Sequence, residues 1–194
     1  MSPRNREFDR DEVVLKAMTV FRDQGYEATS MQDLVDRMGI NRFSLYATFN
    51  SKHDLFIAAL EEYFNRVAVP FFDRLKDSKS GLKRIEMVLL ELVSRIKSGE
   101  SSNGCLLCNT IAELGAMTDA RTGKILKKYL KLVEDDFRAA IERAKELGEL
   151  PPGVDASRHA KVLATYSTGL LSVAKVMSKR KAAESVRAIV ATIR

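Results

Sequence analysis

The chain has 194 residues, 45% of them apolar, and carries a formal net charge of +6 at pH 7. That length and apolar fraction suit one or two globular domains with a buried core and exclude a disordered chain. No apolar run reaches the length of about eighteen residues that a membrane span requires, and no secretory signal opens the sequence, so we expect a cytoplasmic protein without a membrane partner.

The first elements predicted along the chain form a helix-turn-helix behind a leading helix. The leading helix runs from Asp9 to Gln24 on the spacing of its apolar residues. The next begins at Ser30, which forms a short capping box with Asp33. Gly39 supplies the left-handed residue that ends this helix, and Asn41 caps the following one. Two short helices joined by so short a turn are typical of a helix-turn-helix.

The helix after Asn41 is expected to present an aromatic side chain outward. At about 100 degrees per residue, Phe43 lies roughly 160 degrees from Leu45, the residue taken to face the core. An outward ring among polar neighbours indicates a contact surface; the alternative is that Phe43 packs under the N-terminal arm or a neighbouring loop. Arg42 suits a guanine edge, a Phe suits a thymine methyl group, and the nearby hydroxyls suit base edges or phosphates.

Net charge does not by itself predict nucleic-acid binding here. Residues 1–53 hold eight basic and eight acidic side chains, whereas the stretch from Arg37 to Lys52 holds three basic and no acidic ones. This local excess provides for a few phosphate contacts, which added salt weakens. After residue 174 six basic residues face one acidic residue, and we interpret that cluster as the solvated flank of a helix.

The stretch from Gly25 to Leu55 closely resembles the DNA-binding domain of the TetR family of transcriptional regulators. The matching positions are Gly25-Tyr26, Thr29-Ser30, Asp33-Leu34, Gly39-Ile40, Leu45-Tyr46, Phe49 and Lys52 to Leu55. The resemblance implies an all-helical homodimer that binds a near-palindromic operator in double-stranded DNA, usually as a repressor, and leaves it when a small-molecule effector occupies the C-terminal domain. It also implies that Tyr46 and Lys52 contact phosphates. Many members carry a small residue where this chain has Phe43, so the operator sequence does not follow from the family.

From these features we predict the DNA-binding residues and the architecture. The DNA-binding set is Thr29, Ser30, Gln32, Asn41, Arg42, Phe43, Ser44, Tyr46, Thr48 and Lys52. The fold is expected to be all-α, with an N-terminal three-helix helix-turn-helix domain at residues 1–53 and a C-terminal helical ligand-binding and dimerisation bundle at residues 54–194, about nine helices in total. The later helices are expected at residues 51–70, 80–97, 105–114, 119–147, 155–177 and 181–193, with Pro70 bending or ending the first of these.

The last two predicted helices have the pattern of an association surface. Their apolar residues recur at spacings of three and four, with small residues that allow close helix approach. Two such helices from each of two chains make a four-helix dimer bundle, and the alternative is a bundle within one chain. The predicted interface residues are Val162, Tyr166, Leu170, Val173, Met177, Val186, Ile189, Val190 and Ile193.

The segment from Gly104 to Gly115 contains both cysteines. Cys105 and Cys108 lie one helical turn apart, where their sulfurs can share a metal, form a strained disulfide or simply pack. Two thiols do not complete a zinc site, so no metal is expected. The segment resembles that of TetR-like repressors that sense electrophiles or unsaturated acids, which implies a thiol-based redox or electrophile sensor. The apolar neighbours favour packing in the core instead.

An enzyme and a bound cofactor are not expected. Helical thiol oxidoreductases place a His about one turn after their CxxC, and Ile111 and Ala112 occupy that place here. We predict instead a pocket among the C-terminal helices for an effector of unknown identity. Its predicted lining is Met87, Cys105, Cys108, Asn109, Tyr129, Phe137 and Tyr166.

Overall fold

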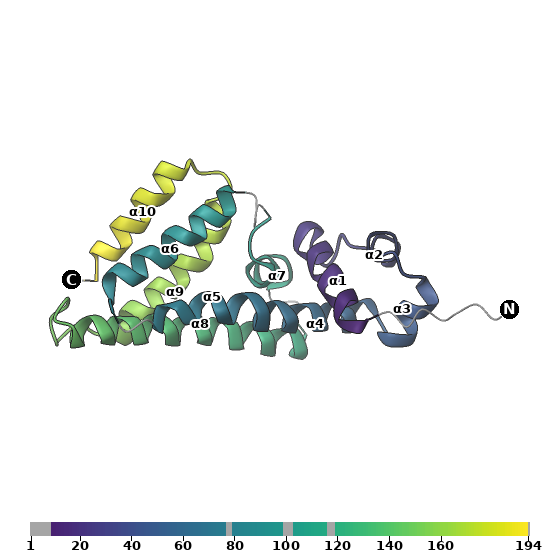
Figure 1. Ribbon diagram of the computed structural model, residues 1–194, viewed down its shortest axis with the longest axis horizontal. Coiled ribbons are helices and arrows are strands. Elements are labelled where there is room, and N and C mark those ends of the chain that lie inside the picture. Colours follow the sequence, from purple (N-terminus) through teal and green to yellow (C-terminus); the bar gives the residue numbers. More distant parts are fainter. Residues whose placement is uncertain (1–8, 77–78, 99–102, 116–118, 194) are drawn as a thin grey trace.

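A computed structural model of the chain describes residues 9–76, 79–98, 103–115 and 119–193. These residues form helices and turns without a strand. The α-helices are α1 (Arg10–Gln24), α2 (Met31–Met38), α3 (Arg42–Thr48), α4 (Lys52–Tyr63), α5 (Val69–Asp73), α6 (Leu82–Lys97), α7 (Leu106–Leu114), α8 (Ala120–Glu146), α9 (Ala156–Val173) and α10 (Lys179–Ala191). Helices α1 to α3 occupy one end of an elongated molecule, α6, α8, α9 and α10 form a bundle that extends to the other end, and α7 lies between the two (Figure 1).

The helix starts are fixed by the side chains that the sequence indicated. Asp9, Ser30, Asn41 and Ser51 are the N-caps of α1 to α4, and each side chain accepts a hydrogen bond from a backbone N–H of the first turn. Ser30 forms the full capping box, since Asp33 also accepts from the Ser30 backbone N–H at 2.8 Å. The chain therefore enters the helix-turn-helix in the predicted register.

The long helix after the helix-turn-helix does not end at Pro70. Helix α4 continues through a π-helical turn (Phe64–Ala68) into α5 and then a short 3-10 turn (Arg74–Lys76). Pro70 lies in the first turn of α5, directly after the π turn. The helix therefore continues past Pro70 and does not end there, and the π turn is the irregularity in the rod next to the proline. Counting this rod as one helix, the described residues contain nine.

The core is continuous from the N-terminal helices into the bundle. Helix α1 packs on α4, where the Phe21 and Phe56 rings lie 5.0 Å apart in an edge contact. In the bundle, Phe72, Tyr129 and Phe137 pack together and are almost fully buried. Because α4 contributes to both regions, the predicted boundary at residues 53 and 54 falls inside one helix. No helix among the described ranges is long and apolar enough to cross a bilayer.

Candidate nucleic-acid interface and internal pocket

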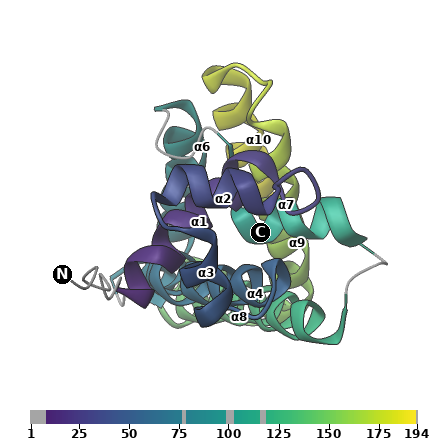
Figure 2. The same cartoon turned by 90° about the vertical axis from the view of Figure 1, so that its right-hand side faces the viewer.

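Helix α3 projects from the N-terminal unit and carries the exposed aromatic residue. Figure 2 looks along the molecule onto this unit, with α2 and α3 in front of the bundle helices. Leu45 is fully buried and anchors α3, whereas the Phe43 side chain is 84% exposed. Tyr46 is exposed as well, and the Arg42 guanidinium lies 5.8 Å from its ring centroid. Phe43 therefore points outward, as its position relative to Leu45 predicted, and among the described residues it does not pack under a neighbouring loop; the N-terminal arm, residues 1–8, lies outside the described residues.

Several other predicted contact residues also lie on the outer surface of α2 and α3. Ser30, Gln32, Asn41, Arg42 and Thr48 are exposed, and Ser44 is half-buried. Two of these side chains are also engaged locally, since Gln32 donates to Asp36 at 2.8 Å and Thr48 donates to the Ser44 carbonyl at 3.1 Å. Together these side chains surround Phe43 with groups that donate or accept hydrogen bonds.

Thr29 and Lys52 are placed differently from the other predicted contacts. The Thr29 side chain is buried, and its hydroxyl donates to the Gly25 carbonyl at 2.5 Å. The Lys52 ammonium donates to the carbonyls of Tyr26 at 2.9 Å and of Thr29 at 3.0 Å, and it lies 4.2 Å from the Tyr26 ring centroid. Both side chains thus hold the loop between α1 and α2, and we infer that they position the interface from inside it.

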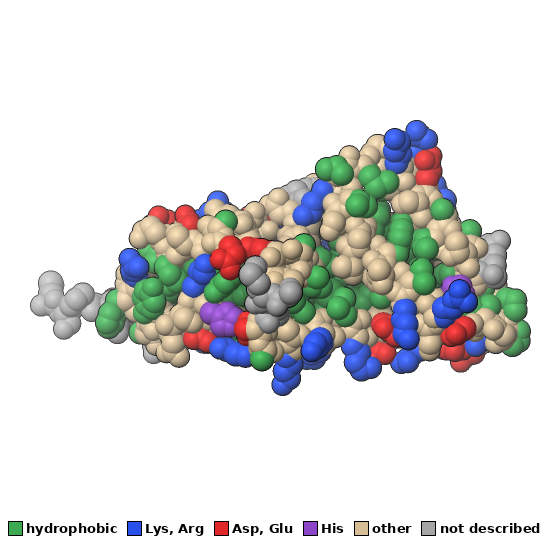
Figure 3. Space-filling model, turned by 180° about the vertical axis from the view of Figure 1, so that it is seen from behind, with side chains coloured by type: hydrophobic (Ala, Val, Ile, Leu, Met, Phe, Trp, Pro, Cys, Tyr) green, Lys and Arg blue, Asp and Glu red, His purple; other side chains and the backbone are tan. Residues whose placement is uncertain are grey.

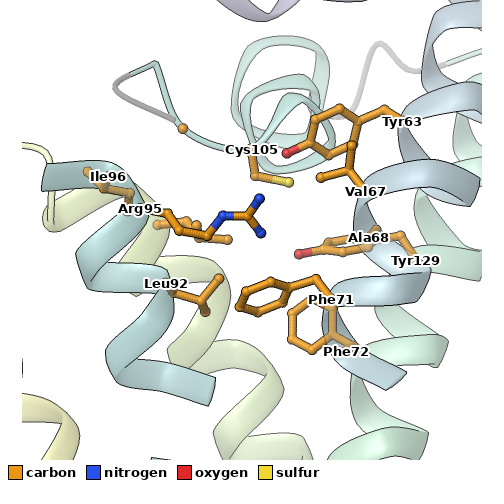
Figure 4. A pocket seen from close by; sticks show the side chains of 12 residues that line it. Tyr63, Val67, Ala68, Phe71, Phe72, Leu92, Arg95, Ile96, Cys105 and Tyr129 are labelled. Carbon is orange, nitrogen blue, oxygen red and sulfur yellow. The ribbon is translucent and has the colours of Figure 1, made fainter. Parts of the chain in front are cut away.

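An internal pocket lies in the bundle between the α4–α5 rod, α6, α8 and the residues that precede α7. Its volume is about 40 Å³, and its lining is mostly apolar and aromatic, which leaves room for only a few water molecules. The guanidinium of Arg95 extends from α6 into the pocket, close to the sulfur of Cys105 (Figure 4). The lining residues are Tyr63, Val67, Ala68, Phe71, Phe72, Leu92, Arg95, Ile96, Gly104, Cys105, Tyr129 and Leu171.

Only part of the predicted pocket lining lies at this pocket. Cys105 and Tyr129 line it, and Cys108 lies just behind them, with its sulfur 3.3 Å from the Tyr129 hydroxyl. Phe137 is fully buried elsewhere in the core. The remaining three predicted residues do not reach the pocket.

Each of those three has a different environment. Met87 is 48% exposed on the outside of α6. Asn109 faces the end of α1 and donates to the Arg22 carbonyl at 3.5 Å, and Tyr166 shares a hydrogen bond with Ser185 of α10 at 2.8 Å. The helices that carry these residues were predicted correctly, but the face that each helix turns toward the pocket was not. Tyr63, Phe71 and Arg95 were missed because they lie on helices distant in sequence and come together only in the folded bundle.

The two cysteines occupy the N-cap and third positions of α7. Hydrogen bonding by the Cys108 side chain and by the backbone N–H groups of Cys108 and Leu107, with a contribution from the Tyr63 hydroxyl, lowers the pKa of Cys105 to about 7 despite its burial. The same hydrogen bond and burial raise the pKa of Cys108, which keeps that group a thiol. Burial among apolar neighbours acts in the opposite direction and raises the pKa of Cys105, but the hydrogen bonds, above all the one from the Cys108 side chain, outweigh it. In the described part of the chain, no three metal-binding side chains form a cluster.

The apolar faces of α9 and α10 divide between the core and the surface. Leu170, Val186 and Ile193 are buried within the chain, so the structure removes them from the predicted dimer interface. Six of the predicted residues keep accessible surface: Val162, Tyr166, Val173, Met177, Ile189 and Val190. Seen from behind, hydrophobic side chains gather over this part of the bundle (Figure 3).

Both the N-terminal and the C-terminal parts of the chain match models of known protein families. A family model described as "Bacterial regulatory proteins, tetR family" matches residues 14–59, and one described as "Tetracyclin repressor-like, C-terminal domain" matches residues 81–190. The uncharacterized HTH-type transcriptional regulator YezE of Bacillus subtilis (strain 168) is 34% identical over 174 residues, which cover 89% of each chain. The HTH-type transcriptional repressor ComR of Escherichia coli (strain K12) is 30% identical over 86% of this chain and 80% of its own.

Among solved structures, a cysteine mutant of the TetR family transcriptional regulator CifR in complex with 26-base-pair double-strand operator DNA is similar over nearly the whole length. It superposes with a TM-score of 0.82 at 30% identity, and the match covers 97% of this chain and 98% of that one.

Proposed function

Because the chain belongs to the TetR family of bacterial regulatory proteins, we propose that it is a repressor that binds a near-palindromic operator as a homodimer and releases it when a small molecule occupies the internal pocket. As a regulator of chromosomal DNA it acts in the cytoplasm. The observation that carries the proposal is the exposed face of α3, where Phe43 projects among Arg42, Ser44, Tyr46 and Thr48. These groups fit a major groove, in which guanidinium, aromatic and hydroxyl groups contact base edges and phosphates.

The proposed operator contact follows from the way α3 is held. Its N-cap Asn41 accepts from the Ser44 backbone N–H at 2.7 Å, and the buried Leu45 fixes its rotation. The contact side chains therefore present a defined pattern before DNA is bound. The operator-bound CifR mutant has the same fold as this chain, which supports the same use of α3.

The dimer is proposed to form through the accessible apolar residues of α9 and α10. Val162 and Val173 are 44% and 47% exposed, and Gly169 between them leaves open space beside the helix. A small residue between two apolar ones allows close approach of a helix from a second copy. Dimerisation through this face gives two α3 helices that read half-sites separated by one DNA turn, about 34 to 36 Å.

The internal pocket is the proposed effector site. Its aromatic walls suit an apolar molecule, and Arg95 adds one cationic group beside Cys105. A volume of about 40 Å³ is far below that of a drug-sized site, so the pocket must widen when a ligand enters. Because α4, α6 and α8 all border the pocket, such widening changes the position of α4 under the helix-turn-helix.

A second candidate is favoured by the low pKa of Cys105, namely that the effector is an electrophile. The Cys105 thiolate would attack the β-carbon of an unsaturated carbonyl compound. The S–C bond forms as the π electrons move to the carbonyl oxygen, and a proton from solvent completes the adduct. A Cys105→Ser variant that is still released from DNA by an electrophile active on the parent would exclude this candidate.

The central proposal is tested by a gel shift with DNA from upstream of the chain's own gene at two salt concentrations. A specific band that weakens at the higher salt concentration is expected, and no specific band at either concentration rejects the proposal. A thermal-shift screen of apolar metabolites and electrophiles then identifies the effector, since a ligand that binds only the folded state raises the melting midpoint.

A further inference from the structure

Helix α7, like α4, reaches from the pocket to the helix-turn-helix unit. Figure 1 shows it between α1 to α3 and the bundle, and it packs on both α1 and α4. Its first turn begins at Cys105, which lines the pocket, and its last turn carries Glu113. A single short helix thus has one end at the proposed effector site and the other end at the DNA-binding unit.

The Glu113 carboxylate binds the loop between α1 and α2. One oxygen accepts from the Tyr26 backbone N–H at 3.0 Å, and the other accepts from the Glu27 backbone N–H at 2.8 Å. Hydrogen bonds to a carboxylate are shorter and stronger than neutral ones, and two of them fix direction as well as distance. Gly25 makes this approach feasible, because a Cβ atom at that position would lie 2.9 Å from both carboxylate oxygens.

Lys52 holds the same loop by donating to backbone carbonyl groups of that loop. Its ammonium donates to the carbonyls of Tyr26 and Thr29, while Glu113 accepts from the N–H groups of Tyr26 and Glu27. The loop leads directly into Ser30, the N-cap of α2. A carboxylate on α7 and an ammonium on α4 therefore set the position of α2, and α3 is packed against α2.

We propose that Glu113 is a positioning residue that holds the α1–α2 loop in the DNA-binding arrangement, and that displacement of the first turn of α7 at the pocket breaks its two hydrogen bonds. This inference rests on the proposed function. A helix as short as α7 moves as a rigid unit, so a shift at Cys105 is transmitted to Glu113. The pocket at Cys105 and the DNA-binding surface are then coupled through one conformational equilibrium, and the coupling is reciprocal. A ligand near Cys105 must weaken operator binding, and operator DNA must keep Cys105 enclosed.

The test uses iodoacetamide as the probe, so the natural effector need not be known. Alkylation of Cys105 in the full-length protein is timed by tandem mass spectrometry with and without saturating upstream DNA. Cys105 is only 7% exposed, so its alkylation reports opening of the first turn of α7. In the parent, DNA should slow the reaction at least threefold, although no predicted DNA contact touches Cys105.

In Glu113→Gln the amide oxygen can still accept from one of the two N–H groups, but the amide nitrogen is a donor and leaves the other N–H without its acceptor. We expect operator affinity to fall about tenfold, alkylation without DNA to accelerate, and the protection by DNA to disappear. Gly25→Ala should reproduce these effects from the loop side, because its Cβ displaces the carboxylate and because the backbone at this position, with a φ of +84°, disfavours a residue with a Cβ. Glu146→Gln, which alters an exposed carboxylate at the far end of α8, is the matched control and should behave as the parent.

The outcomes separate the two proposals. If the parent gives no specific complex with upstream DNA, the proposed function fails. If the parent binds DNA but the protection of Cys105 is the same in the parent, Glu113→Gln and Gly25→Ala, the positioning role of Glu113 is overturned and the proposed function stands.

Discussion

Truncation of Phe43 to alanine should weaken operator binding without weakening the fold. The side chain is 84% exposed, so its removal leaves no cavity in the core. A Phe side chain offers about 200 Å² of surface, of which roughly 170 Å² is accessible here. Covering half of that area against base edges, at about 25 cal/mol per Å², contributes about 2 kcal/mol per protomer. Affinity should therefore fall about 30-fold for each half-site.

The measurement is a fluorescence anisotropy titration of labelled upstream DNA at several salt concentrations. Phe43 carries no charge, so the variant should keep the salt dependence of the parent while its affinity falls at every concentration. Leu147→Ala is the control, since Leu147 is 45% exposed at the end of α8, far from α3. The assignment of α3 as the recognition helix is refuted if Phe43→Ala binds upstream DNA and altered operators as tightly as the parent does.

Three further predictions concern single atoms or groups. Tyr46→Phe removes one exposed hydroxyl and should weaken DNA binding roughly fivefold at each half-site. The affinity for the operator and for unrelated DNA should fall to the same extent, and a loss of affinity confined to the operator would contradict a phosphate contact. Hydrogen bonding by Cys108 lowers the pKa of Cys105 to about 7, so the thiolate is lost below that pH. The rate of Cys105 alkylation should therefore rise with pH around a midpoint near 7, and a midpoint at or above 8.5 would show an ordinary thiol. Gly81→Ala places a Cβ 2.3 Å from the Cβ of Ala144 and should lower the free energy of unfolding by about 2 kcal/mol, seen as a lower urea midpoint; an unchanged midpoint would mean that the α6–α8 contact yields easily.

The helices and the helix-turn-helix could be predicted from the sequence, because their signals are local. A capping residue such as Ser30 or Asn41 acts on N–H groups two or three positions away, and a left-handed glycine such as Gly39 ends the helix that precedes it. The outward direction of Phe43 also followed from the sequence, since the buried Leu45 two positions on fixes the rotation of a short helix.

The sequence did not show which part of each apolar helix face contacts which neighbouring helix. Periodicity gives a broad apolar stripe, but Leu170 packs inside the chain while Val173 on the same helix stays exposed. That division depends on how α9 packs against α8 and α6. The pocket brings Tyr63 and Arg95 together from helices distant in sequence. Glu113 reads as an ordinary surface carboxylate in the sequence, and it acquires two backbone partners only because α7 packs against the loop after α1. Contacts of this kind depend on long-range packing geometry, which no pattern within a single helix encodes.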